Sequence, residues 1–155
     1  MAQNIAYKDI KIGDKASVSK TVSEHDVYAY AGVTGDFNPV HVNAEFAKTS
    51  MFKQRIAHGM ISAGLISAVL GTELPGISTI YMGQDLKFLA PVFYNDTLTA
   101  EVECIEKNDE KHRLVFRTTV TNQDGKIVTD GKAMVTKKYI VEGISKDNQT
   151  LITIY

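Results

Sequence analysis

The sequence predicts an α+β domain in which an antiparallel β-sheet wraps around one long, buried helix. Residues 58–71, HGMISAGLISAVLG, are almost wholly apolar, and the absence of a charged face indicates a helix that is buried on all sides. The chain that follows alternates between apolar and polar residues, which predicts four long strands near residues 78–90, 97–107, 112–122 and 126–138. The apolar faces of these strands can bury the helix, so a wrapped helix is the simplest packing solution.

Short helical elements and a turn are expected before the long helix. Ser23 can cap a helix through Asp26, and two glycines end the helical pattern just before Asp36. Residues 36–39, DFNP, predict a turn, because proline fixes its own φ and favours an extended conformation in the residue before it. Asn43 is a candidate cap for a second short helix.

Length and composition fit one ordinary globular domain. The chain has 155 residues, of which 44% are apolar and 23% are charged. We place the domain at residues 1–138 and treat residues 139–155 as a C-terminal extension of unknown role, either an extra strand or a loose end. Cys104 is the only cysteine, which excludes an intrachain disulfide, and its alternating neighbours predict a buried, inert thiol.

Charge and hydropathy bear on the partners and on the location of the protein. A formal net charge of -1 provides no basic field of the kind that attracts nucleic acid or an acidic membrane surface. The N-terminus lacks the pattern of a secretory signal, and no stretch approaches the roughly 18 apolar residues of a membrane span. The sequence therefore predicts a cytoplasmic protein that binds neither nucleic acid nor membrane.

Three polar residues on the predicted turn form a candidate acid/base group. Asp36, Asn38 and His41 lie close together in the sequence, so their side chains can converge on one small volume. Imidazole titrates near neutrality, a carboxylate beside it can stay ionised, and an amide can orient a water molecule. The alternative is a plain turn in which the Asp and Asn side chains cap the backbone.

The start of the long helix offers a candidate site for developing negative charge. The first N–H groups of a helix have no partner within it, and the helix dipole favours an anion there. Gly59 would let a thioester carbonyl approach its N–H without interference from a Cβ atom. The alternative is a tight entry into the helix, with His58 bracing that turn as a structural residue rather than acting as a second base.

Three motifs, taken together, resemble the MaoC-like (R)-specific enoyl-CoA hydratases. They are DFNPVH at residues 36–41, RIAHGM at residues 55–60, and LKFLAPV at residues 86–92, the last of which precedes DTL at residues 96–98. The motifs occur in the family's order, and the resemblance covers residues 8–138. It implies a hot-dog fold, in which an antiparallel sheet wraps a long helix, and homodimers whose two sheets join edge to edge.

The resemblance also implies an activity and a set of site residues. Asp36, Asn38 and His41 match the hydration loop of the family, and the N–H of Gly59 matches its oxyanion donor. The implied reaction is the reversible hydration of a trans-2-enoyl-CoA to an (R)-3-hydroxyacyl-CoA. It needs no metal and no cofactor, because coenzyme A is part of the substrate. Ser67 matches a polar residue that lines the site in some relatives, although a helix-packing serine fits equally well.

Several points stay open at the level of sequence. The alternatives to a hydratase of short-chain enoyl-CoA are a dehydratase acting on acyl-carrier protein, a thioesterase, and a non-catalytic acyl-thioester binding module. Which of Asp36 and His41 is the base is not decided. The end wall of the acyl site has three candidates, Leu65, Val69 and Leu70. Coenzyme A phosphates need cationic partners, for which the candidates are Arg55, Lys53, Lys87 and Lys111.

Overall fold

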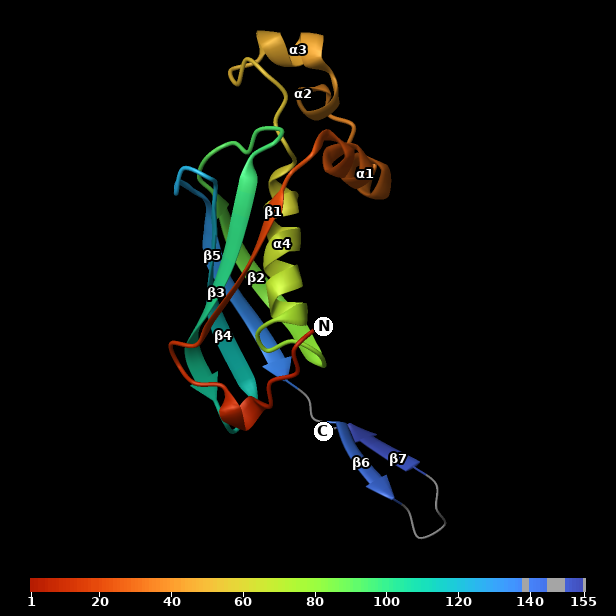
Figure 1. Cartoon of the computed structure of the whole chain (residues 1–155), viewed down its shortest axis with the longest axis vertical. Helices are drawn as coiled ribbons and strands as arrows, with labels where there is room; N and C mark the ends of the chain where they lie inside the picture. The colour runs from red at the N-terminus through yellow and green to blue at the C-terminus, as the bar shows by residue number, and fades with distance from the viewer. Residues whose placement is uncertain (138–139, 145–149, 155) are drawn as a thin grey trace.

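Five antiparallel strands form the main sheet of this protein, in the order β1-β3-β4-β5-β2. The computed structural model describes residues 1–137, 140–144 and 150–154. One long helix, α4 (Gly59–Thr72), lies along one face of the sheet (Figure 1). The strands are β1 (Lys15–Thr21), β2 (Thr79–Phe88), β3 (Thr97–Asn108), β4 (Arg113–Thr121) and β5 (Ile127–Lys137). The predicted helix and four predicted strands are thus confirmed, with ends that differ by at most a few residues.

Strand β1 was not expected from the sequence. Most of its side chains are exposed, and it pairs with β3 from Lys15 opposite Glu103 to Thr21 opposite Thr97. The amino group of Lys15 lies 3.1 Å from a carboxylate oxygen of Glu101 and 3.2 Å from one of Glu103. Only Ala16 and Val18 of this strand pack against the core, so its alternation of apolar and polar residues is too short to reveal it as clearly as the other strands.

The core lies between α4 and the inner face of the sheet. Ile66 and Val69 of α4 are fully buried, as are Leu98 and Phe116 of the strands opposite. Cys104 is also fully buried, and burial raises the pKa of its thiol. The prediction of a buried cysteine is therefore confirmed, and the raised pKa is consistent with an inert thiol.

The expectation that α4 is buried on all sides is wrong for the single chain. Met60 is 51% exposed, and Gly64, Ser67 and Ala68 are exposed as well. The physical reason is that the five-stranded sheet covers only one side of the helix. The apolar composition of a helix indicates that its surface is shielded from water, but it does not indicate what covers each side of the helix.

The exposed surface of α4 extends onto a strand at the edge of the sheet. β2 lies at one end of the strand order, and most of its side chains are exposed. The exposed side chains include three large apolar ones in succession, namely Ile80, Tyr81 and Met82. An exposed edge with apolar side chains favours pairing with another strand.

Three short helices gather at the end of the sheet where α4 begins (Figure 1). They are α1 (Glu24–Thr34), α2 (Pro39–Val42) and α3 (Ala44–Thr49), and a 3-10 turn spans Tyr7–Asp9 near the N-terminus. The predicted caps at Ser23 and Asn43 are confirmed, and Ser23 forms a reciprocal capping box with Asp26. The hydroxyl of Ser23 is the main cause that lowers the pKa of Asp26 to about 2. Helix α2 was not predicted.

The C-terminal extension contains a second, two-stranded sheet. β6 (Ile140–Ile144) pairs with β7 (Thr150–Ile154) in antiparallel register. Residues 138–139, 145–149 and 155 lie outside the described residues. The expected boundary at residue 138 falls on this part of the chain, so it stays a prediction. No helix within the described residues is long and apolar enough to cross a membrane.

Candidate active site

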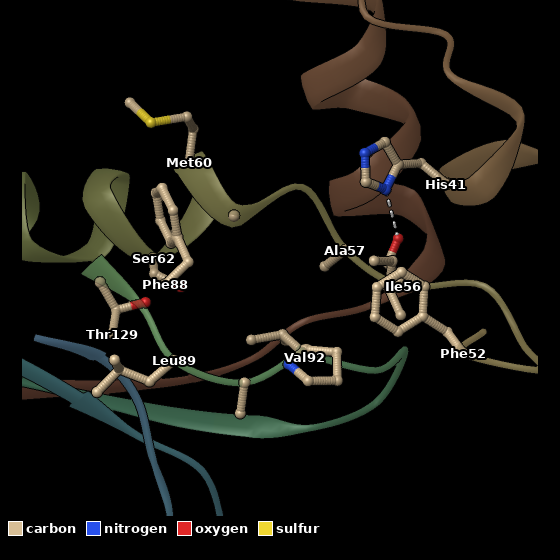
Figure 2. A pocket seen from close by; sticks show the side chains of 13 residues that line it. His41, Phe52, Ile56, Ala57, Met60, Ser62, Phe88, Leu89, Val92 and Thr129 are labelled. Atoms are coloured by element: carbon tan, nitrogen blue, oxygen red, sulfur yellow. Dashed lines mark hydrogen bonds between the residues drawn. The ribbon is translucent and has the colours of Figure 1, made fainter. Parts of the chain in front are cut away.

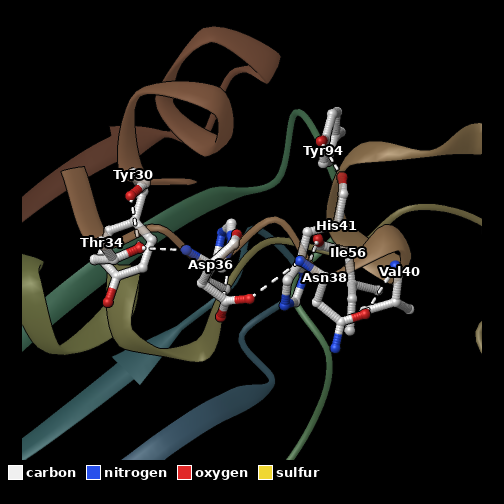
Figure 3. A network of polar contacts seen from close by, with 9 residues as sticks. Tyr30, Thr34, Asp36, Asn38, Val40, His41, Ile56 and Tyr94 are labelled. Carbon is white, nitrogen blue, oxygen red and sulfur yellow. Dashed lines mark hydrogen bonds and ion pairs between the residues drawn. The ribbon is translucent and has the colours of Figure 1, made fainter. Parts of the chain in front are cut away.

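The loop between α1 and α2 places Asp36 and Asn38. Gly35 ends α1 in the left-handed region, with φ 77°, and so turns the chain sharply before Asp36. The N–H of Asn38 donates to Oδ1 of Asp36 at 3.2 Å, and the N–H of Val40 donates to Oδ1 of Asn38 at 3.1 Å (Figure 3). Each side chain therefore caps the backbone through one oxygen, as in the plain-turn alternative. The side chain of Asp36 is still 51% exposed, so its other oxygen, Oδ2, is available.

His41 lies on α2, and a backbone contact fixes the orientation of its ring. Nδ1 lies 2.8 Å from the carbonyl oxygen of Ile56. A carbonyl can only accept, so Nδ1 carries the hydrogen and the lone pair of the neutral ring is on Nε2. The hydroxyl of Tyr94 donates to the backbone oxygen of His41, which holds α2 in place.

Burial and neighbouring groups act on the pKa of His41 in opposite directions. Desolvation is the largest effect and lowers this pKa, while the contact with the Ile56 carbonyl raises it. His58 lowers the pKa further, and Asp36 raises it, with a net shift below the usual value. His41 therefore tends to be neutral at a lower pH than an ordinary histidine, which suits a base.

His58 joins this loop to the start of α4. Its Nε2 lies 2.9 Å from the backbone oxygen of Asp36 and 3.9 Å from the carboxylate oxygen Oδ2 of the same residue. Its ring centroid lies 3.9 Å from that of His41. The side chains of Asp36, His41 and His58 each contribute one nitrogen or oxygen atom to a cluster, and these three atoms all lie within 4.8 Å of one another. The tertiary structure thus brings the two separate motifs into contact.

The geometry of this cluster favours proton transfer over metal binding. Two histidines and a carboxylate are a ligand set that divalent metals accept. However, the nitrogen of His58 that faces Asp36 donates its hydrogen to the backbone oxygen of Asp36, so it presents no lone pair there. The expectation that the protein needs no metal and no cofactor stays a prediction.

Gly59 is the first residue of α4, so the helix itself does not use its N–H. The ring of Phe88 lies against this residue. A Cβ atom added to Gly59 would lie 3.1 Å from two carbons of that ring, which is tighter than most Cβ contacts. Glycine at this position therefore leaves room for both the ring and an approaching ligand atom.

A mainly apolar pocket of about 430 Å³ opens beside His41 and Gly59 (Figure 2). Its other walls come from residues 50–58 before α4, which we call the strap, from α4, and from the end of β2 and the segment after it, with one residue of β5. The lining residues are His41, Phe52, Ile56, Ala57, Gly59, Met60, Ser62, Phe88, Leu89, Ala90, Pro91, Val92 and Thr129. A carbonyl group placed near Gly59 would therefore lie within reach of an apolar chain-binding surface.

A second hollow, of about 510 Å³, runs between the open side of α4 and the edge strand β2. Ser67 lines this hollow together with Tyr30 and Tyr81. Met60 and Phe88 line both hollows, so these two side chains stand between them. No role for either residue was predicted from the sequence, although Met60 lies inside the RIAHGM motif and Phe88 inside the LKFLAPV motif.

The other predicted acyl-site residues lie on the opposite face of α4. Val69 and Leu70 are 0% and 1% exposed, and Leu65 is 9% exposed. All three belong to the hydrophobic core, and none lines either of the two hollows. The structure thus brings together Asp36, His41 and Gly59 and places the three candidates for the end wall in the core.

Arg55 lies in a small hollow of about 220 Å³ with two lysines, Lys48 and Lys53. Its guanidinium contacts a carboxylate oxygen of Glu24 at 2.5 Å and stacks over the ring of Tyr94 at 4.4 Å. Of the other cationic candidates, Lys87 is on β2, and Lys111 is in the turn between β3 and β4, at the end of the sheet opposite α1, α2 and α3 (Figure 1).

Comparison with known proteins assigns the chain to a family. Residues 8–126 match the model of the MaoC like domain. The chain is 54% identical to the (R)-specific enoyl-CoA hydratase of Rhodospirillum rubrum over 129 residues, which cover 83% of this chain and 89% of that protein. It is 42% identical to the 3-hydroxybutyryl-CoA dehydratase of Methylorubrum extorquens, with coverage of 83% and 82%.

A solved structure supports the same assignment. The R-hydratase PhaJ1 of Pseudomonas aeruginosa superposes with a TM-score of 0.84 at 47% identity, and the match covers 88% of this chain and 87% of that chain. The sheet around α4 is therefore the predicted hot-dog fold. Together with the matches in sequence, this likeness establishes that the chain belongs to the MaoC-like domain family.

Proposed function

We propose that this protein is a hydro-lyase that converts trans-2-enoyl-CoA to (R)-3-hydroxyacyl-CoA, and that it also catalyses the reverse dehydration. One observation carries the proposal. A carboxylate, Asp36, and an imidazole with a free Nε2, His41, lie side by side at the start of α4, where Gly59 presents an unused N–H. The names of the most similar relatives support the same reaction.

Gly59 activates the substrate by accepting charge on the thioester oxygen. Its N–H donates to that oxygen, and the helix dipole of α4 adds to the positive potential there. Polarisation of the carbonyl makes Cβ electrophilic and lets negative charge move from Cα to the oxygen when water adds. One donor of this kind contributes roughly 10²–10³-fold in rate.

Asp36 and His41 handle the water molecule. His41 takes a proton from the water through Nε2, because Nδ1 is held by the carbonyl of Ile56. The hydroxyl oxygen bonds to Cβ, and the protonated ring of His41 delivers its proton to Cα on the same face as the charge returns from the thioester oxygen. Asp36 orients the water and balances the charge on the protonated ring. One proton leaves the water and one reaches Cα, so the pair ends in its starting state.

The hollows beside α4 support a short-chain substrate. The acyl chain occupies the 430 Å³ pocket, where the walls are mainly apolar. Phe88 and Met60 stand between this pocket and the hollow that contains Ser67. A long acyl chain would have to pass these two side chains, whereas a four-carbon chain would not.

The open side of α4 and the edge strand β2 support a homodimer or a multiple of dimers. Both surfaces are apolar and exposed in the single chain, and they are adjacent at the hollow that both of them line. A second copy that adds its own β2 would continue the sheet and cover α4. The dimer would therefore bury the surfaces that the five-stranded sheet leaves open.

Coenzyme A phosphates bind at the cationic hollow beside the strap before α4. Lys53 and Arg55 belong to the same strap as Phe52 and Ile56, which line the acyl pocket. Arg55 already forms an ion pair with Glu24, so Lys53 is the more available of these two cations for binding a phosphate. A phosphate placed here would gain charge-assisted hydrogen bonds.

Turnover of matched thioesters tests the proposed function. Crotonyl-CoA should be hydrated, and chiral analysis should find the (R)-3-hydroxy product. Butyryl-CoA, which has no double bond, should release no coenzyme A, and crotonyl-acyl-carrier protein should react more slowly than crotonyl-CoA. Release of coenzyme A from butyryl-CoA would instead establish a thioesterase, and binding of crotonyl-CoA without turnover would establish a binding module.

A further inference from the structure

His58 is buried at the start of α4, but its side chain does not cap the helix as side chains at that position usually do. It is the N-cap residue of α4, but its side chain makes no capping hydrogen bond. The residue is only 3% exposed, and burying an imidazole is favourable only when it gains other contacts. Its hydrogen bond is to Asp36 and one of its ring contacts is to His41, the two residues to which the proposed function assigns the handling of the water molecule.

We infer that His58 is a positioning residue of this site, which anchors the backbone of Asp36 by a hydrogen bond and orients the ring of His41 by stacking. The inference rests on the proposed function, because it concerns the same pair of residues. It adds a third residue whose role is to hold the other two, and whose own atoms do not touch the substrate.

The first contact anchors the loop that carries Asp36. Nε2 of His58 donates to the backbone oxygen of Asp36 at 2.9 Å. Beyond Asp36, the loop is held mainly by its own short-range bonds, such as the one from the N–H of Asn38 to Asp36 Oδ1. The bond from His58 ties this loop to the rigid start of α4, next to Gly59. It therefore fixes the distance between the carboxylate and the proposed oxyanion site.

The second contact restrains His41. The two rings stack with centroids 3.9 Å apart and an interplanar angle of 35°. Nδ1 of His41 is already bound by the carbonyl of Ile56, so the stack limits the remaining freedom of the ring and keeps Nε2 directed away from the backbone. Tyr30 of α1 lies against His58, with ring centroids 4.8 Å apart, and so supports the stack.

The remaining nitrogen shows why His58 is not itself the base. Nδ1 is buried and has no hydrogen-bond partner among the described residues, and Nε2 is used by Asp36. His58 also does not line the pocket beside His41 and Gly59. One ring nitrogen is hydrogen-bonded to Asp36 and the other is buried away from the pocket. The side chain can therefore position neighbouring groups, but it cannot exchange a proton with a bound substrate.

The stack also predicts an effect on the titration of His41. The groups that face its ring are Asp36 from the loop after α1, the carbonyl of Ile56 from the strap, and His58 from the start of α4. Of the two titratable neighbours, Asp36 raises the pKa of His41 and His58 lowers it. Replacing His58 removes the effect that lowers the pKa and admits water, so the pKa of His41 should rise.

Three variants separate the two contacts. His58→Gln keeps an N–H donor at a similar reach but removes the ring. His58→Phe keeps a ring but removes the donor, and His58→Leu removes both. Misplacing a reacting group by about 1 Å can cost on the order of 10²-fold in rate. We therefore expect a kcat loss of about that size for His58→Leu and for His58→Phe, with substantial rescue in His58→Gln and little change in KM.

The measurements are kcat and KM with crotonyl-CoA across pH, with NMR titration of the His41 ring in each variant. In all three variants the acid limb of kcat/KM and the NMR pKa of His41 should move to higher pH, which a purely structural role would not produce. Circular dichroism and thermal melting identify the variants that fold. Folded His58→Leu protein with wild-type kcat and an unmoved His41 pKa would overturn the inference.

Two further outcomes are equally decisive. Equal kcat losses in folded His58→Gln and His58→Leu would show that the hydrogen bond to Asp36 does not position the carboxylate, and the inference would fail in its main part. The NMR titration does not depend on turnover. If the wild-type protein lacked hydratase activity, the proposed function would fail, while a shift of the His41 pKa would still establish the coupling between the two rings.

Discussion

The carbonyl oxygen of Ile56 accepts a hydrogen bond from Nδ1 of His41 at 2.8 Å, and this contact determines which ring nitrogen can act as a base. Because Nδ1 carries the hydrogen, the lone pair of the neutral ring lies on Nε2. The sequence left the roles of Asp36 and His41 open. The contact with the backbone of Ile56, 15 positions further along the chain, leaves Nε2 free to accept a proton and so supports the proposal that His41 is the base.

The proposed acid/base pair predicts a non-additive loss of activity. Asp36→Asn and His41→Gln keep approximate size and hydrogen-bonding ability, so stability should change little. Each should lower the turnover of crotonyl-CoA by roughly 10²–10⁴-fold. The double variant should lose much less than the product of the two losses, because groups that act on one water are not additive. A folded single variant that keeps more than about a tenth of wild-type turnover would contradict the assignment.

A matched pair of substitutions at Gly59 tests the oxyanion donor. Gly59→Ala keeps the N–H, and its Cβ requires only a small shift of the Phe88 ring, which is half-exposed. Gly59→Pro adds the same Cβ and removes the N–H, and proline is well tolerated at the first position of a helix. The extended backbone of His58, with ψ 132°, also suits a residue before proline.

We expect Gly59→Pro to lose roughly 10²–10³-fold more turnover than Gly59→Ala. The measurement is steady-state turnover of crotonyl-CoA, with circular dichroism spectra to compare the helix content of both variants. Equal turnover in the two folded proteins would remove the N–H of Gly59 from the mechanism.

The open side of α4 predicts a dimer that a charged side chain would disrupt. Light scattering should give a mass of twice the 17.1 kDa of one chain, or a multiple of that. Gly64 lies on the exposed face of α4, and a Cβ there meets nothing within 4 Å in the single chain. Gly64→Glu should therefore leave the fold of each chain intact but introduce a buried charge at the interface, which shifts the mass towards the monomer.

Gly32 of α1 provides the control, because a Cβ at that position also meets open space. Gly32→Glu should keep the mass of the wild-type protein. A wild-type monomer with full activity would refute the dimer.

The capping box of α1 predicts a stability difference that depends on pH. Ser23→Ala removes the N-cap and should lower the free energy of unfolding by about 1 kcal/mol at neutral pH. It also removes the main cause that holds the pKa of Asp26 at about 2, against an ordinary value of 3.8. A depressed carboxylate pKa stabilises the fold above the ordinary value, and this contribution is lost as the pH falls towards 2.

The difference in unfolding free energy between wild-type protein and Ser23→Ala should therefore shrink between pH 4 and pH 2, as measured by urea denaturation. A difference that is constant over this range would mean that Asp26 does not depend on Ser23 for its ionisation.

The cationic hollow predicts a substrate-binding effect at Lys53. Lys53→Ala should raise KM for crotonyl-CoA several-fold without changing kcat, because a phosphate contact is made equally in the ground state and the transition state. The effect should weaken as salt is added, since the charges are exposed. Lys111→Ala, at the opposite end of the sheet, is the matched control and should leave KM unchanged. Equal KM values in both variants would place the phosphates elsewhere.

Patterns among residues close together in the sequence were sufficient to predict most helices, strands and caps of this protein. An almost wholly apolar run of residues identified α4, and the alternation of apolar and polar residues identified four strands, of which β3, β4 and β5 have one face in the core. Ser23 and Asn43 could be recognised as caps, since a cap is a contact within a few residues. β1 was missed because only two of its side chains, Ala16 and Val18, are apolar and pack against the core, which is too short an alternation to identify a strand.

The direction of side chains on α4 could not be predicted from the sequence. Leu65, Val69 and Leu70 are chemically suited to an acyl site, but the sheet packs against them. Ser67 lies on the other face, which the sheet leaves open. A helix that is apolar all round does not show which of its faces its own sheet covers.

The sequence by itself determined the elements and the motifs, because capping, turn formation and apolar period depend on neighbours in the chain. Only the tertiary structure decided how the motifs act together. The contacts from His41 to Ile56 and from His58 to Asp36 join residues that are 15 and 22 positions apart. Such contacts form only when the packing of α4 against the sheet has fixed where each backbone carbonyl lies, and no local pattern records that position.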